Sequence, residues 1–200
     1  STGSLAVIAE SGNDTIVIDA GVPASTTNIA AAGYAPLNFS GNNYSGITVF
    51  GMGGADTIDL TNLGSGQSAT LPITLDGDTA DDTGAATNGD ASADTLRVRA
   101  TGLSTGNVTL LGGDGDDIVT LHETNAYVFG GDGDDTLSAD PYLPGDRSRL
   151  HGEAGNDTLV AGSANDARTE LYGGEGDDRL VGHPGARLDG GAGSDRHVLW

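Results

Sequence analysis

Glycine and aspartate recur together in the second half of the chain, in loops whose composition suits the binding of a hard cation. Residues 112–120 read GGDGDDIVT and residues 130–138 read GGDGDDTLS, so that Asp117 and Asp135 are equivalent and lie 18 residues apart. Glycines at positions 1, 2 and 4 of this nonapeptide let the backbone adopt left-handed conformations and form a cup of carbonyl oxygens. Asp at position 6 adds an anionic oxygen. Because Ca²⁺ prefers oxygen ligands in variable geometry, the pattern predicts calcium binding.

The nonapeptide recurs along the rest of the chain. Copies that keep the Gly-x-x-Gly-x-Asp core end at Asp157, Asp178 and Asp195, and looser copies end at Asp14, Asp56 and Asp94. From Asp94 onward, successive position 6 aspartates are separated by 23, 18, 22, 21 and 17 residues, which predicts the stacked coils of one solenoid. The two upstream intervals, of 42 and 38 residues, predict about two coils each.

Aliphatic residues flank the loops at constant positions and indicate strands. Two residues before the first glycine of each loop stand Val49, Leu110, Val128, Leu150, Leu171 and Leu188. Position 8 holds Ile58, Val119, Leu137, Leu159 and Leu180. Because side chains alternate between the two faces of a strand, each set would point to one face, and coils about 4.8 Å apart would pack these residues into a narrow core. The sequence therefore predicts an all-β, parallel β-solenoid.

These motifs resemble the RTX (repeats-in-toxin, hemolysin-type) calcium-binding repeat, strongly from about residue 112 to the C-terminus and partially before about residue 105. The resemblance implies a parallel β-roll in which each ion lies between adjacent coils. It also implies the ligands of each ion: the backbone carbonyls of positions 2 and 4 in the earlier loop, those of positions 1 and 3 in the later loop, and the position 6 aspartates of both.

Transferred to this chain, the family's scheme predicts about four calcium ions between five successive loops. The carboxylate ligands would be Asp117, Asp135, Asp157, Asp178 and Asp195. The carbonyl ligands would be Gly113, Gly115, Gly130, Gly131, Asp132, Gly133, Gly152, Glu153, Ala154, Gly155, Gly173, Gly174, Glu175, Gly176, Gly190 and Ala192. In the looser loops, Asp56 and Asp94 are candidate metal ligands, and whether those loops hold calcium is left open.

The chain departs from the usual family pattern in one respect. Family members commonly run nonapeptides in direct tandem, whereas here each glycine loop alternates with a segment that lacks the glycine cup, such as 121–129 or 161–172. We therefore expect calcium mainly along one edge of the roll and ordinary turns along the other. Residues 1–105 would form degenerate coils with long loops and residues 106–200 the regular calcium-binding coils of one continuous solenoid.

Two upstream segments interrupt the repeat. Residues 21–46 are rich in small and polar residues without a clean period, and could supply an irregular coil between Asp14 and Asp56. Residues 76–94 read as a long acidic loop, which is more simply a solvated insertion than a separate ion site. The looser nonapeptide that ends at Asp94 would begin inside this loop, at Gly89.

The composition limits what else the chain could be. Its 200 residues include 34 glycines, no cysteine, and 29 acidic against eight basic residues, for a formal net charge of −21. The scarcity of bulky apolar residues suits a thin two-layer roll, and the lack of cysteine excludes a disulfide framework. The acidic balance argues against nucleic acid as a partner, and no apolar run is long enough to span a membrane. Because the charge opposes compaction of the metal-free chain, folding and ion binding should be one process.

Three functional classes remain open. The leading interpretation is a calcium-dependent structural module of a secreted or surface-displayed bacterial protein, which the family's usual setting implies would fold into a rigid rod after export. The alternative is an adhesin, surface-layer piece or self-assembling filament that uses the solenoid ends. A polysaccharide-modifying enzyme is less favoured, because the arginines are sparse and the four histidines lack zinc-ligand spacing, so we expect no catalytic residues.

Overall fold

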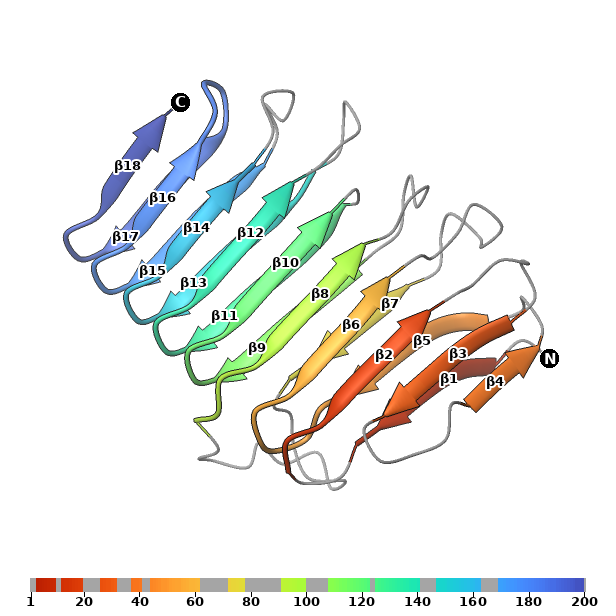
Figure 1. Ribbon diagram of the computed structural model, residues 1–200. Helices are drawn as coiled ribbons and strands as arrows, with labels where there is room; N and C mark the ends of the chain where they lie inside the picture. Colours follow the sequence, from red (N-terminus) through yellow and green to blue (C-terminus); the bar gives the residue numbers. More distant parts are fainter. Residues whose placement is uncertain are drawn as a thin grey trace.

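Two stacked β-sheets make up the part of the chain that the structure describes (Figure 1). A computed structural model describes residues 3–9, 12–19, 26–31, 37–40, 44–61, 72–77, 91–99, 108–122, 125–140, 147–162 and 169–199. In these ranges every regular element is a strand, and there is no helix that could cross a membrane.

Each coil contributes one strand to each sheet. Sheet A, in spatial order, contains β1 (Gly3–Ile8), β5 (Tyr44–Phe50), β7 (Ile73–Asp76), β9 (Val108–Asp114), β11 (Ala126–Asp132), β13 (Arg149–Ala154), β15 (Glu170–Glu175) and β17 (Arg187–Ala192). Sheet B contains β18 (Arg196–Leu199), β16 (Arg179–Gly182), β14 (Thr158–Ala161), β12 (Thr136–Asp140), β10 (Ile118–His122), β8 (Thr95–Arg99), β6 (Thr57–Thr61), β2 (Thr15–Asp19), β3 (Thr26–Ala31) and β4 (Leu37–Ser40). The coils pair in parallel in both sheets, which confirms the predicted β-roll.

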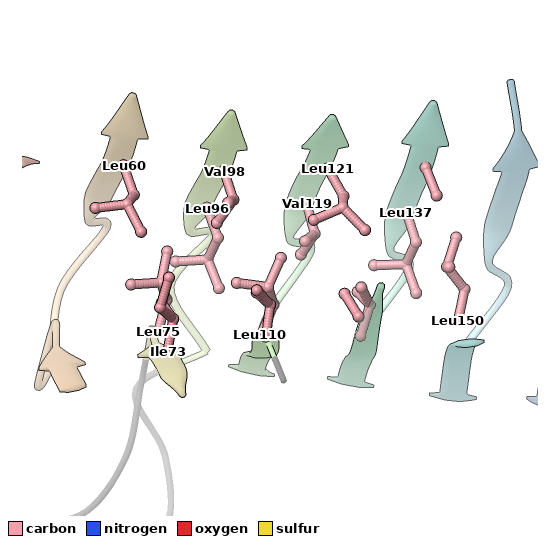
Figure 2. Packing of buried hydrophobic residues seen from close by; sticks show 14 of the residues in the cluster. Leu60, Ile73, Leu75, Leu96, Val98, Leu110, Val119, Leu121, Leu137 and Leu150 are labelled. Atoms are coloured by element: carbon pink, nitrogen blue, oxygen red, sulfur yellow. The ribbon is translucent and has the colours of Figure 1, made fainter. Parts of the chain in front are cut away.

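Aliphatic side chains from the two sheets fill the space between them (Figure 2). In sheet A, Val128 is in register with Leu110 and Leu150, and in sheet B, Leu137 is in register with Val119. These residues are at most 1% exposed, so the two ladders expected from the sequence are the core. Further buried rungs that the sequence pattern did not single out are Leu75 and Leu96.

The two long upstream intervals hold one coil each, so the prediction of two coils was wrong. β2 pairs directly with β6, and β6 pairs directly with β8. In the first interval, β3 and β4 pair antiparallel beside β2 and extend sheet B, and so do not form the irregular coil expected there. Residues 20–25, 32–36 and 41–43 lie outside the described ranges.

The glycine loops that the structure describes lie along one edge of the stack, which runs along the lower left and bottom of Figure 1. The opposite edge is described completely in the last coil, where a tight turn joins β16 to β17 and the N–H of Ala186 donates to the carbonyl of His183 (3.0 Å). This turn has no glycine cup, in agreement with the expectation of ordinary turns there. Pairing of β7 with β9 and of β8 with β10 carries both sheets across residue 105.

The outer face of sheet A carries a stack of rings that ties neighbouring strands together away from the core. His151 lies between Phe129 and Tyr172, with centroid distances of 5.0 and 4.7 Å. Beside the stack, Arg149 Nε donates to Glu170 Oε2 at 2.6 Å. These contacts supplement the backbone ladder between β11, β13 and β15.

Replacing a core rung should cost far more than replacing an outward-facing residue on the next strand. Leu137 is fully buried, so Leu137→Ala should lower the free energy of unfolding by about 2–5 kcal/mol. Ile118 is 49% exposed, so Ile118→Ala should cost less than about 1 kcal/mol. Denaturant unfolding in saturating calcium, followed by circular dichroism, measures both. Equal losses would contradict the assignment of inner and outer faces.

Candidate metal centre

The loops that join sheet A to sheet B share one backbone conformation. The residues with positive φ at position 2 include Gly113, Gly131, Gly174 and Gly191, and those at position 4 include Gly115, Gly133, Gly155, Gly176 and Gly193. Glu153 breaks the residue pattern at position 2 but not the conformation, since its φ is 81°. The loop shape therefore persists where a side chain makes it unfavourable.

The position 6 aspartates form a continuous ladder along the loop edge. The backbone N–H of each donates to Oδ1 of the equivalent aspartate in the next loop. The distances are 2.7 Å for Asp14 to Asp56, Asp56 to Asp94 and Asp94 to Asp117, 2.8 Å for Asp117 to Asp135 and Asp135 to Asp157, 2.9 Å for Asp157 to Asp178, and 3.1 Å for Asp178 to Asp195. One oxygen of each accepting carboxylate is thus held by the preceding loop.

The second carboxylate oxygen lies against the first glycine of its own loop. A Cβ on Gly130 would collide with Oδ2 of Asp135 and lie 2.7 Å from the carbonyl oxygen of Gly152. A Cβ on Gly152 would collide with Oδ2 of Asp157. Among the described residues, Oδ2 of Asp135, Asp157 and Asp178 is buried without a hydrogen-bond partner. Position 1 must be glycine because a carboxylate oxygen and a carbonyl oxygen converge there.

Carbonyl oxygens from both loops face each gap between coils. Those of positions 2 and 4 point forward: the carbonyls of Gly113 and Gly115 lie against Gly131 and Gly133. The same holds for position 2 carbonyls of Glu153 and Gly174 and for position 4 carbonyls of Gly133, Gly155 and Gly176.

The carbonyls of positions 1 and 3 point back toward the preceding loop. At position 1, the carbonyls of Gly130, Gly152, Gly173 and Gly190 lie against the equivalent glycine before them. At position 3, the carbonyl of Asp132 accepts the N–H of Gly115 at 2.7 Å. The carbonyls of Ala154, Glu175 and Ala192 accept equivalent bonds at 2.8, 2.9 and 2.8 Å. Each carbonyl oxygen keeps a second lone pair for another partner.

Burial dominates the electrostatics of the aspartate column. Asp135, Asp157 and Asp178 are at most 2% exposed. Burial raises the pKa of Asp135 to about 7 and that of Asp157 to about 6, and it also raises the pKa of Asp178. Neighbouring carboxylates add to each rise, while the hydrogen bond from the preceding aspartate's N–H opposes it. The ionised column is therefore unfavourable unless a cation lies beside it.

The donor atoms fit calcium better than a softer metal. No group of three or more His, Cys, Asp or Glu side chains gathers as a metal site in the described residues. A cation between these loops would instead meet backbone carbonyls and two carboxylates, which are all hard oxygen donors in an irregular arrangement.

A second ladder, at position 5, was not anticipated from the sequence. Side-chain oxygens of Asp116, Asp134, Asn156 and Asp177 accept the position 5 N–H of the following loop at 2.9, 2.7, 2.9 and 2.8 Å. Here the later loop donates its N–H to the earlier one, which is the reverse of the direction in the position 6 ladder. The signal was present, because position 5 is Asp or Asn in four successive loops, and these side chains readily bond to nearby backbone.

Comparison with known families agrees with this geometry. The RTX calcium-binding nonapeptide repeat matches four segments of the chain, at residues 104–125, 127–141, 145–167 and 170–187. Residues 104–187 therefore contain four copies of this repeat. The resemblance found in the sequence is thereby confirmed, and this RTX segment is a calcium-binding repeat module. No curated protein sequence and no solved structure matches the chain.

Glu153 offers a test of the loop conformation. Glu153→Gly should raise the free energy of unfolding in calcium by about 1 kcal/mol relative to Glu153→Ala, because only glycine adopts positive φ without a Cβ clash. Both variants remove the same charge, so the difference isolates the backbone. Denaturant unfolding measures it, and an Ala variant at least as stable as the Gly variant would refute the assigned conformation.

Acidification should act in opposite directions with and without calcium. Asp135 and Asp157 have pKa values above the ordinary 3.8, so the metal-free roll binds more protons than the unfolded chain between about pH 4 and 7. Its stability should therefore rise as pH falls through this range. Calcium binding displaces those protons. The calcium concentration at the midpoint of folding should therefore rise as pH falls, by up to about tenfold per pH unit for each proton displaced. Titrations followed by circular dichroism from pH 8 to 5.5 measure both trends, and a midpoint independent of pH would contradict them.

Proposed function

We propose that the RTX loops bind about four Ca²⁺ ions, one in each gap between successive aspartates from Asp117 to Asp195, and that these ions convert an extended acidic chain into a rigid rod. The observation that carries this proposal is the buried Oδ2 atom of Asp135, Asp157 and Asp178, each without a hydrogen-bond partner in the described structure. Each lies beside the first glycine of its own loop. A divalent cation in the gap would satisfy these oxygens and reduce the repulsion along the column.

The energetics support coupling of folding to ion binding. The roll has a single layer of buried hydrophobic side chains between its two sheets. The chain has no cysteine for a disulfide, and its formal net charge is −21. Extracellular calcium modules bind at roughly 10⁻⁴ to 10⁻³ M. A site at a hundredfold its dissociation constant contributes about 2.7 kcal/mol, so a few such sites are comparable with the whole stability of a typical domain.

We place this module outside the cell, in a secreted or surface-displayed protein, with a structural and not a catalytic role. Millimolar calcium outside and scarce calcium inside would keep the chain unfolded for export and fold it afterwards. The absence of cysteine accords with a chain that uses metal ions in place of disulfides as cross-links.

Self-association is a second candidate, favoured by the end of the stack at β17 and β18. Within the described residues, each of these strands pairs with a neighbour on one side only. His197 stands in the inward register of Leu180, and Leu199 is 60% exposed. Such an edge can pair with a further strand, as in an adhesin, surface-layer or filament subunit. Concentration-dependent sedimentation of the calcium-loaded chain would favour this alternative.

The central test compares the chain at pH 8 in chelator and in millimolar calcium. Circular dichroism should show strand structure only with calcium, and sedimentation velocity should show compaction. Asp135→Ala should raise the calcium midpoint several-fold more than Asp195→Ala, because Asp135 borders two of the proposed gaps and Asp195 borders one. Asp189→Ala, on the exposed outer face of sheet A, is the charge-matched control. A fully ordered chain in EGTA would disprove the proposal.

A further inference from the structure

We infer that two additional Ca²⁺ ions bind upstream of the family-matched repeats, between Asp56 and Asp94 and between Asp94 and Asp117. The loop that these two sites share is split: its first position is Gly77 and its last is Asp94, 17 residues later. This inference rests on the proposed function, because it assigns the same kind of ion to gaps that no contiguous nonapeptide defines.

Gly77 occupies the place of a position 1 glycine. It follows Leu75 by two residues, and Leu75 is in register with Leu110, which precedes Gly112 by two. A Cβ on Gly77 would collide with Oδ2 of Asp94 and lie 2.5 Å from the carbonyl oxygen of Gly112. Gly130 makes the same pair of contacts, with Asp135 and Gly152. Gly77, and not Gly89 as the sequence suggested, therefore begins this loop.

Ser92 and Asp94 supply the other half of the split loop. A Cβ on Gly115 would collide with the carbonyl oxygen of Ser92, as one on Gly133 would with that of Gly115, so Ser92 holds position 4. Asp94 is 1% exposed and donates its N–H to Oδ1 of Asp117 at 2.7 Å. The gap between Asp94 and Asp117 thus has both carboxylates, a forward carbonyl from Ser92 and a backward carbonyl from Gly112.

The gap between Asp56 and Asp94 is built in the same way. A Cβ on Gly51 would lie 2.5 Å from Oδ2 of Asp56 and collide with the carbonyl oxygen of Gly77. Positions 2 and 4 of this loop, Met52 and Gly54, have φ of 78° and 120°. Asp56 is 1% exposed, and its N–H donates to Oδ1 of Asp94 at 2.7 Å. Asp94 therefore borders two gaps, as Asp135 does.

The first gap of the stack differs from these two at position 1 of its earlier loop. Ala9 follows Ile8, which is in register with Phe50, so Ala9 takes the position that Gly51 holds in the next coil. At the equivalent glycines of the following loops, Gly51 and Gly77, a Cβ would collide with or crowd Oδ2 of the position 6 aspartate. Asp14 is correspondingly only partly buried. We therefore expect no ion between Asp14 and Asp56, and six ions in the chain as a whole.

The test counts the calcium ions bound by the full 200-residue chain with native mass spectrometry in millimolar calcium. We expect six ions for the unmodified chain, four for Asp94→Asn, which alters both upstream gaps, and five for Gly77→Ala, whose Cβ enters the second gap only. Asp189→Asn removes one exposed carboxylate on the outer face of sheet A and should keep six.

The outcomes separate this inference from the proposed function. Four ions in both the unmodified chain and Asp94→Asn would overturn the split-loop sites and leave the proposed function standing. No bound calcium in the unmodified chain would overturn both. Should Asp94→Asn fail to fold, anomalous diffraction from calcium in crystals of the unmodified chain decides the matter. Peaks beside Asp94 support the split loop, and peaks confined to the gaps from Asp117 to Asp195 overturn it.

Discussion

A column of buried carboxylates, repeated at the spacing of β-strands, is the constraint on which the rest of this fold depends. Two unit charges about 4.8 Å apart repel by roughly 3 kcal/mol at an effective dielectric constant of 20. The column places such charges at every rung, and burial has already raised the pKa of Asp135 to about 7. A few such repulsions would equal the whole stability of a typical domain, about 5–15 kcal/mol. A fold of this kind therefore needs either protons or divalent cations in its loops, and above neutral pH the protons are largely absent.

The remaining features of the loops hold the position 6 carboxylates in register from one coil to the next. Each loop is fastened to the next by two hydrogen-bond ladders of opposite polarity, one through position 6 and one through position 5. Positions 1 and 4 have no room for a side chain because carbonyl oxygens of adjacent loops lie against them. The aliphatic ladders set the same spacing from inside the roll. Backbone, core and carboxylates thus impose one common repeat distance, which is what a row of shared cation sites requires.

Most of the architecture could be predicted from the sequence because its signals are periodic. The two aliphatic sets and the position 6 aspartates recur in register, so the stacked coils and their core follow from spacing, while the parallel roll and its calcium edge follow from the resemblance to the RTX repeat. The errors arose where spacing is ambiguous. The number of residues between Asp14 and Asp56 cannot distinguish an extra coil from an excursion such as β3 and β4. The sequence places the first glycine of the Asp94 loop at Gly89 because a nonapeptide pattern is contiguous, whereas strand pairing brings Gly77 beside Asp94. The position 5 ladder was missed because those residues were read only as part of the repeat.

The confinement of the oxygen-lined gaps to one edge has an evolutionary consequence for the other. The return from sheet B to sheet A, such as the turn at His183 and Ala186, carries no part of the aspartate ladder, and excursions like that of β3 and β4 leave the pairing of β2 with β6 intact. Selection can therefore lengthen, shorten or replace these returns without changing the row of carboxylates and carbonyl oxygens on the loop edge. Such a scaffold tolerates grafting of new segments on one flank while the opposite flank remains almost invariant.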